Sequence, residues 1–123
     1  MMSFGVGAYY NMTKAALDSF AKCYSLELAP KGVRINNVNP GPIRTEIGSD
    51  KMGAEVAEQM WQAIGNIQPV GRVAETSEVA RAIGFLASPE SSFITGVCLP
   101  VDGGMLQNHV MAQFGHQALA AQQ

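Results

Sequence analysis

The chain has 123 residues, of which 47% are hydrophobic and 15% are charged, with a formal net charge of −2. This length suits one compact domain and is too short for two. The small net charge and the lack of a basic run exclude an electrostatic surface for nucleic acid or an anionic membrane. No apolar stretch approaches the roughly eighteen residues that a membrane span needs, and the first residues lack the basic and apolar regions of a secretion signal. We therefore expect a cytoplasmic protein that does not insert into a membrane.

Residues that commonly form disulfides or bind metals are few and scattered. Cys23 and Cys98 have neither a disulfide framework nor Cys-x-x-Cys spacing, so we expect buried free thiols. His109 and His116 lie in a polar tail with no carboxylate or cysteine at ligand spacing. The sequence therefore predicts no metal site.

The first predicted element is a helix over Ala8–Leu28. Its larger apolar residues recur at steps of three and four, the periodicity of one helix face: Leu17, Phe20, Tyr24 and Leu28. Alanines and Cys23 extend the apolar surface around the flank, and a helix that is apolar on more than one side needs more than one partner. The segment Ala29–Gly32 ends the helix, because proline cannot continue the hydrogen-bond ladder and glycine suits the exit turn.

A strand is predicted over Val33–Val38, followed by the turn residues Asn39–Pro42. Within the strand, Asn36 is interpreted as a structural hydrogen-bonding residue, whereas the sequence offers no explanation for Asn37. A second helical region spans about Gly48–Ile67. It places four apolar residues on one face: Met52, Val56, Met60 and Ile64.

A third helix is predicted to begin with Thr76 or Ser77 as its N-cap and to run to about Ala87. A second strand covers Val97–Val101 and closes with Asp102–Gly104. Helix, strand, helix and strand in this order predict an α/β architecture with parallel pairing. Two parallel strands are a poor sheet alone, because their outer edges stay unpaired and both faces need helices. We therefore expect the sheet to be incomplete.

Tyr10 and Lys14 are the residues whose spacing indicates chemistry. Residues four apart share one face of a helix, so the phenol and the ammonium can lie over the same site. Ionising a phenol at neutral pH requires about 4 kcal/mol of stabilisation. A lysine charge about 6 Å away supplies somewhat less than 3 kcal/mol at an effective dielectric near 20, so a second positive charge would have to supply the rest. The pair alone is weak evidence, since this spacing is also common on solvated helix faces.

The segments around this pair resemble the short-chain dehydrogenase/reductase family from about Gly5 to Gly104. Five segments carry the resemblance in the family's order and spacing: Tyr10–Leu17, Leu26–Ala29, Gly32–Asn36, Asn39–Glu46 and Gly96–Gly104. Thr13 stands where the family usually has serine. The resemblance implies the C-terminal half of a Rossmann-type doubly wound parallel sheet over residues 1–104, followed by a polar tail over residues 105–123. It also implies an oxidoreductase that uses NAD or NADP on a small-molecule carbonyl or alcohol.

The resemblance assigns a role to each matching residue. Tyr10 corresponds to the general acid/base that acts on the substrate oxygen, and Lys14 to the residue that favours its phenolate and binds the nicotinamide ribose. Tyr10 and Lys14 both belong to the implied cofactor-binding set. Its other positions are Pro40, Gly41, Ile43 and Thr45. The first two shape a loop whose backbone passes close to the nicotinamide ring. The backbone of the third meets the carboxamide, and the hydroxyl of the fourth meets the carboxamide or the pyrophosphate.

Between about Glu46 and Pro69 the resemblance implies a mobile lid over the substrate. Three residues offer the lid apolar surface: Met52, Met60 and Trp61. Packing of these residues in the core is an equally good interpretation. The lid does not identify the substrate among steroids, sugars, acyl thioesters and small ketones.

Segments that bind most of the nucleotide in this family are not found in the chain. The catalytic serine would precede Met1, and Ser3 is not accepted as its substitute. The glycine-rich phosphate loop and the residue that selects NAD or NADP are also absent. We therefore expect a truncated chain that is inactive or weakly active alone and, when complete, a homo-oligomer through helix 8–28. A catalytically inactive short form that pairs with a full-length subunit, and a remnant without activity, stay open as alternatives.

Overall fold

The computed structural model describes residues 7–46 and 53–107. The described residues form two compact units. The first unit runs to Pro40 and resumes over Glu75–Val101, and the second comprises Gly41–Ala74 and the chain from Asp102. Within residues 7–46 and 53–107, no helix is long and apolar enough to cross a bilayer.

Helix α1 (Ala8–Leu28) of the first unit has the predicted bounds. It continues into a 3-10 turn over Ala29–Lys31, and Gly32 ends the turn at φ 72°. The side that packs is not the predicted apolar stripe, because Leu17 and Phe20 are 51% and 50% exposed. Ala21 and Ser25 are buried instead. The helix thus meets the rest of its unit through small side chains.

The expectation that both cysteines are buried is wrong for Cys23, which is exposed, while Cys98 is half-buried. The reason is geometric. Cys23 is two residues from both Ala21 and Ser25, and successive helix residues are rotated by about 100°, so its side chain leaves the helix on another side. Cys98 belongs to a strand and faces α1, where its thiol lies 3.8 Å from the Asp18 carbonyl oxygen.

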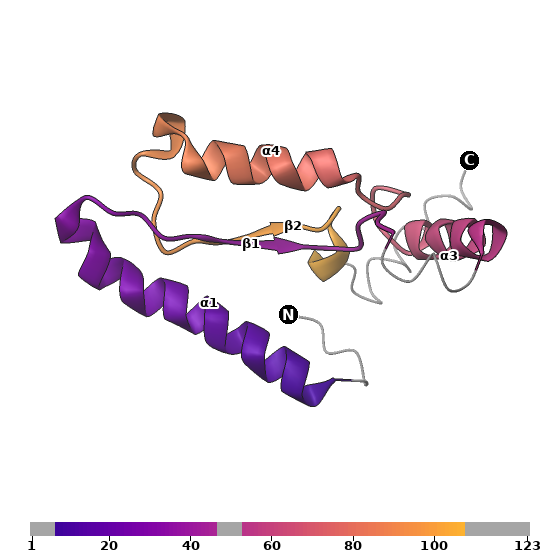
Figure 1. Cartoon of the computed structure of the whole chain (residues 1–123), viewed down its shortest axis with the longest axis horizontal. Helices are drawn as coiled ribbons and strands as arrows, with labels where there is room; N and C mark the ends of the chain where they lie inside the picture. Colours follow the sequence, from indigo (N-terminus) through magenta and orange to yellow (C-terminus); the bar gives the residue numbers. More distant parts are fainter. Residues whose placement is uncertain (1–6, 47–52, 108–123) are drawn as a thin grey trace, which may run out of the picture. The chain divides into compact units, whose positions relative to one another are not determined.

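Strands β1 (Asn37–Pro40) and β2 (Cys98–Val101) pair in parallel, with Asn37 opposite Cys98 and Pro40 opposite Val101. Figure 1 shows α1 on one side of the two strands and α4 (Thr76–Ala87) on the other. Val79 and Leu86 of α4 are buried. The first unit therefore has the helix–sheet–helix layering of the predicted α/β class.

The predicted strand over Val33–Val38 is displaced toward the C-terminus, because side chains take the place of the ladder over residues 34–36. The guanidinium of Arg34 donates to the Ile94 and Ser88 carbonyls, each at 3.1 Å. The amide of Asn36 donates to the Ile94 carbonyl and accepts from the Val97 N–H, also at 3.1 Å. This confirms Asn36 as a structural hydrogen-bonding residue.

Helix α4 begins at Thr76, but its N-cap is Glu75 and not Thr76 or Ser77 as predicted. The backbone N–H of Glu75 donates to Oε2 of Glu78 at 2.9 Å, which is half of a capping box. The Glu75 side chain accepts from the Glu78 N–H in return, which completes the capping box. The predicted end at Ala87 is confirmed.

The second unit contains helix α3 (Ala54–Asn66), which occupies the C-terminal part of the predicted helical region. The expected start near Gly48 and the residue Met52 lie outside the described residues, whereas Met60 and Trp61 are half-buried. Ile43 forms an isolated parallel bridge with Ala74. Asp102 accepts hydrogen bonds from the Gly104 and Leu106 N–H groups, each at 3.0 Å, and so holds the turn that follows β2.

Candidate active site

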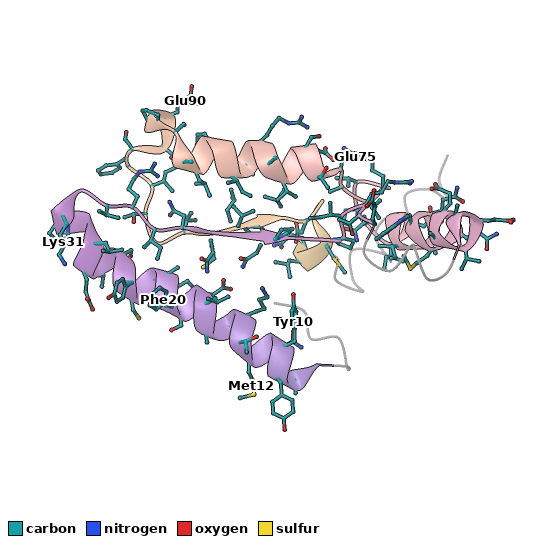
Figure 2. The ribbon with its side chains drawn as sticks, in the orientation of Figure 1. Tyr10, Met12, Phe20, Lys31, Glu75 and Glu90 are labelled. Atoms are coloured by element: carbon teal, nitrogen blue, oxygen red, sulfur yellow. The ribbon has the colours of Figure 1, made fainter. Side chains whose placement is uncertain are left out.

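Tyr10 and Lys14 lie together on the first turns of α1. The Lys14 ammonium is 5.4 Å from the centroid of the Tyr10 ring. Tyr10 is 63% exposed, so this cation–π contact contributes about 0.5–1 kcal/mol. Figure 2 shows Tyr10 projecting from the side of α1 that faces the strands of the same unit. The phenol is thus accessible to a small molecule and has a positive charge beside it.

The hydroxyl of Thr13, in the position where serine is usual, is engaged locally. It donates to the Tyr10 carbonyl at 2.8 Å, a bond within one helical turn. Such back-bonding is as available to threonine as to serine. The departure at Thr13 therefore does not disturb the first turn that carries Tyr10.

The four residues that the resemblance assigned to the cofactor fall in both units. Pro40 ends β1 in the first unit, and Gly41, Ile43 and Thr45 belong to the second. A Cβ on Gly41 would lie 2.8 Å from the Asp102 Cα, which excludes a side chain there. Glycine at this position is therefore required by packing inside the second unit, in addition to any approach of the nicotinamide.

The backbone around Ile43 is fixed by its bridge. The Ala74 N–H donates to the Pro42 carbonyl at 3.0 Å, and the Arg44 N–H donates to the Ala74 carbonyl at 2.8 Å. Because residues alternate in a parallel ladder, the N–H and C=O of Ile43 itself point away from Ala74. One donor and one acceptor on the same residue match the needs of a carboxamide.

Asp18 is a polar residue of α1 that the sequence reasoning missed. Its carboxylate accepts from the Asn37 amide at 3.0 Å and from the Asn39 amide at 3.1 and 3.3 Å. The Asn37 amide also donates to the Leu17 carbonyl at 3.0 Å, which explains an asparagine that had no role in the sequence. The available signal was the pair of asparagines two apart, since such residues share one face of a strand.

Partial burial opposes ionisation of Asp18, but the hydrogen bonds from Asn37 and Asn39 outweigh it and hold the pKa of this carboxyl below its usual value. Burial, and next the negative charge of Asp18, raise the pKa of the Cys98 thiol. At neutral pH the cluster therefore contains a carboxylate and a neutral thiol.

A second polar contact, also not predicted from the sequence, joins the residue after Ile43 to α3. Arg44 and Glu58 form a bidentate ion pair with N···O distances of 2.6 and 3.1 Å. Both side chains remain exposed by more than 40%. The hydrogen bond from Arg44 is the main cause that lowers the pKa of Glu58 below the usual glutamate value. Salt screens such a pair, because both charges stay in contact with water.

We expect hydrogen exchange of the first turns of α3 to accelerate as NaCl is raised from about 0.05 to 1 M, since the Debye length falls over that range. The Glu58→Gln variant should exchange faster at low salt and lose this salt dependence. Because the pKa of Glu58 is lowered by folding, the contribution of the ion pair is present above pH 4.5 and is lost as the pH falls through the lowered value. Glu55→Gln, in the first turn of the same helix, is the control. Equal salt dependence in wild type and Glu58→Gln would contradict the expectation.

Comparison with known proteins places these residues in a family. A family model described as enoyl-(acyl carrier protein) reductase matches residues 2–106. A 4-formylbenzenesulfonate dehydrogenase from Comamonas testosteroni is 44% identical over 96 residues, which are 78% of this chain and 38% of that protein.

Solved structures give the same result. The aldohexose dehydrogenase of Thermoplasma acidophilum has a TM-score of 0.80 at 33% identity, over 89% of this chain and 45% of that chain. ElxO, solved with NADP bound, has a TM-score of 0.76 at 36% identity, over 86% of this chain and 42% of that chain. The chain spans less than half the length of each of these relatives. Since the model match covers most of the chain and the structural neighbours have Rossmann-type sheets, the chain belongs to the short-chain dehydrogenase/reductase family and forms the C-terminal half of its parallel sheet.

Proposed function

We propose that this chain provides the acid/base half of an NAD(P)-dependent oxidoreductase that interconverts a carbonyl and a secondary alcohol. The observation that carries the proposal is the accessible Tyr10 phenol with the Lys14 ammonium 5.4 Å from its ring centroid. The relatives named as dehydrogenases support the same class of reaction.

In the reducing direction, the Tyr10 hydroxyl gives its proton to the substrate oxygen as the carbonyl carbon becomes an alcohol carbon. In the oxidising direction, the Tyr10 phenolate takes the alcohol proton. Lys14 stabilises that phenolate by its charge, and this stabilisation applies in both directions. When bound, the nicotinamide supplies or accepts the hydride.

The residues present fit a nicotinamide. Within the second unit, the backbone N–H and C=O of Ile43 would hold the carboxamide and Thr45 would add a hydroxyl. Taken separately, Lys14 of the first unit would bind the ribose. We propose NAD or NADP without choosing between them, although ElxO was solved with NADP. The substrate class, a small carbonyl or alcohol, belongs to the same proposal, and the cytoplasmic location stays a prediction.

A second candidate function is association through α1 without catalysis. The observation that favours it is the exposed apolar stripe formed by Leu17, Phe20 and Tyr24, of which Tyr24 is 40% exposed. The Phe20 and Tyr24 rings stack with centroids 4.7 Å apart, so they already form one apolar surface. Covering this stripe with a second helix removes apolar area from water.

One experiment separates the two functions. NADH and NADPH are titrated against the purified chain by fluorescence, and turnover is measured with a small ketone and with its secondary alcohol, each with the matching form of the cofactor. Turnover that depends on Tyr10 supports the oxidoreductase. Absence of turnover together with a dimer in sedimentation that Phe20→Glu dissociates supports association alone. Absence of both turnover and a dimer contradicts association and any activity of the chain alone. Low-micromolar cofactor binding would contradict the expectation that the chain alone binds nucleotide weakly.

A further inference from the structure

Asp18 lies one helical turn after Lys14 and two turns after Tyr10. Residues four apart lie on the same side of a helix, so Tyr10, Lys14 and Asp18 follow one line along α1. Asp18 is half-buried where this line meets β1. It is therefore placed to affect the direction in which the Tyr10–Lys14 pair faces.

Hydrogen bonds to Asp18 are directional and come from two points on the strand. Asn37 and Asn39 project from the same face of β1 about 6.6 Å apart, the spacing of alternate strand residues. Both amides converge on the one carboxylate at 3.0 to 3.3 Å. Two donors that reach one acceptor from separate positions restrict rotation of the helix, because turning α1 lengthens at least one of the bonds.

The other buried contacts of α1 determine how close the helix lies to its neighbours more than how it is rotated about its own axis. Ala21 and Ser25 are buried, and a Cβ on Gly96 would lie 2.6 Å from the Ser25 hydroxyl oxygen, so the chain segments approach closely there. Small, nearly round side chains permit close approach but resist rotation weakly. In the half of α1 that carries Tyr10, rotation is restrained by polar contacts with the strands. These are the hydrogen bonds of the Asp18 carboxylate to Asn37 and Asn39 and the bond from the Asn37 amide to the Leu17 carbonyl.

We propose that Asp18 is a positioning residue for the Tyr10–Lys14 pair and that it acts by fixing the rotation of α1 through Asn37 and Asn39. This inference rests on the proposed oxidoreductase function. The phenol oxygen of a helical tyrosine lies about 9 Å from the helix axis, so a rotation of about 10° displaces it by about 1.5 Å. A misplacement of about 1 Å costs on the order of a hundredfold in rate.

The test uses Asp18→Asn, the double variant Asp18→Asn/Asn39→Asp, and the control Glu27→Gln on an exposed part of α1. In Asp18→Asn, the new side-chain amide meets those of Asn37 and Asn39. One carboxylate oxygen that accepted a hydrogen bond is replaced by a donating NH2 group. In the double variant the carboxylate moves to the strand, and each amide again has an oxygen to donate to. We expect kcat to fall on the order of a hundredfold in the single variant, with KM for the cofactor nearly unchanged. The double variant should recover most of the loss, and the control should equal the wild type.

A second readout does not require turnover. In backbone amide spectra, Asp18→Asn should shift the signals of Tyr10 and Lys14, while the signal of Tyr24, next to the Ser25–Gly96 contact, stays in place. The double variant should return the signals of Tyr10 and Lys14 to their wild-type positions. If the wild-type chain, which we expect to be inactive or weakly active alone, shows no turnover, these spectra alone decide on Asp18.

Three outcomes overturn the inference. The first is a lower melting temperature with an unchanged kcat, which would mark Asp18 as structural only. The second is a double variant that behaves no better than the single one. The third is a set of spectral changes confined to residues near position 18.

Discussion

Tyr10→Phe is expected to lower turnover by about 10²- to 10⁴-fold, the usual contribution of a positioned general acid/base. The substitution removes only the hydroxyl, which is the group that carries the proton. It keeps the ring that the Lys14 ammonium approaches to 5.4 Å, so the local structure of α1 should persist. The measurement is kcat in both directions, with cofactor fluorescence to show that binding remains.

The chain contains a matched control for this variant. Tyr9 precedes Tyr10 on the same helix and is 85% exposed. Because adjacent residues point to different sides of a helix, Tyr9 cannot share the line of Tyr10 and Lys14. Tyr9→Phe should leave kcat unchanged. If Tyr9→Phe inactivates the chain and Tyr10→Phe does not, the assignment of the acid/base residue is wrong.

Gly96→Ala is expected to destabilise the first unit by about 2–4 kcal/mol. Gly96 has φ +73°, a left-handed conformation that costs an L residue roughly 1–2 kcal/mol. The new Cβ would also lie 2.6 Å from the Ser25 hydroxyl oxygen and 3.2 Å from the Ser25 Cβ. Ser25 is buried and its hydroxyl donates to the Lys22 carbonyl at 2.7 Å, so it does not move aside easily. Denaturant unfolding measures the loss.

Gly32→Ala is the control, because it separates backbone strain from steric contact. Gly32 has φ +72°, nearly the angle of Gly96, but a Cβ there would meet nothing within 4 Å. It should lose only the left-handed penalty of about 1–2 kcal/mol. The difference between the two variants is the contact with Ser25, and adding Ser25→Ala to Gly96→Ala should recover part of it. Equal losses in the two glycine variants would show that α1 does not approach Gly96 closely.

Elements whose signals are local were predicted well from the sequence. The ends of α1 and α4 follow from Pro30, Gly32 and the Ser88–Pro89 break, and these helices end where predicted. The strand β1 was misplaced because Arg34 and Asn36 satisfy backbone groups with their side chains, which no strand pattern encodes. The cap at Glu75 was missed because it needs the acidic partner three residues later.

In the candidate site, too, the feature within one helix was predicted and the contacts between distant residues were not. The Tyr10–Lys14 pair was found because its spacing brings the side chains together within one helix. Asp18 and Asn39 are 21 residues apart, and Arg44 and Glu58 are 14 apart and lie in different elements. Contacts of this kind depend on how a helix is set against a strand or loop, and hydrophobic periodicity carries no information about that. The roles assigned through the family resemblance stay predictions until the variants are measured.

The division of the described residues into two units has a consequence for how such proteins diversify. The chain passes between the units at only three peptide bonds: Pro40–Gly41, Ala74–Glu75 and Val101–Asp102. Two of them directly follow a strand, and the third precedes the cap of α4. The segment from Gly41 to Ala74 can therefore accumulate substitutions, insertions or a wholesale exchange with that of a relative while α1 and its Tyr10–Lys14 pair keep their own internal contacts. Sequence change would then be concentrated in the segment from Gly41 to Ala74, with the Tyr10–Lys14 pair inherited unchanged.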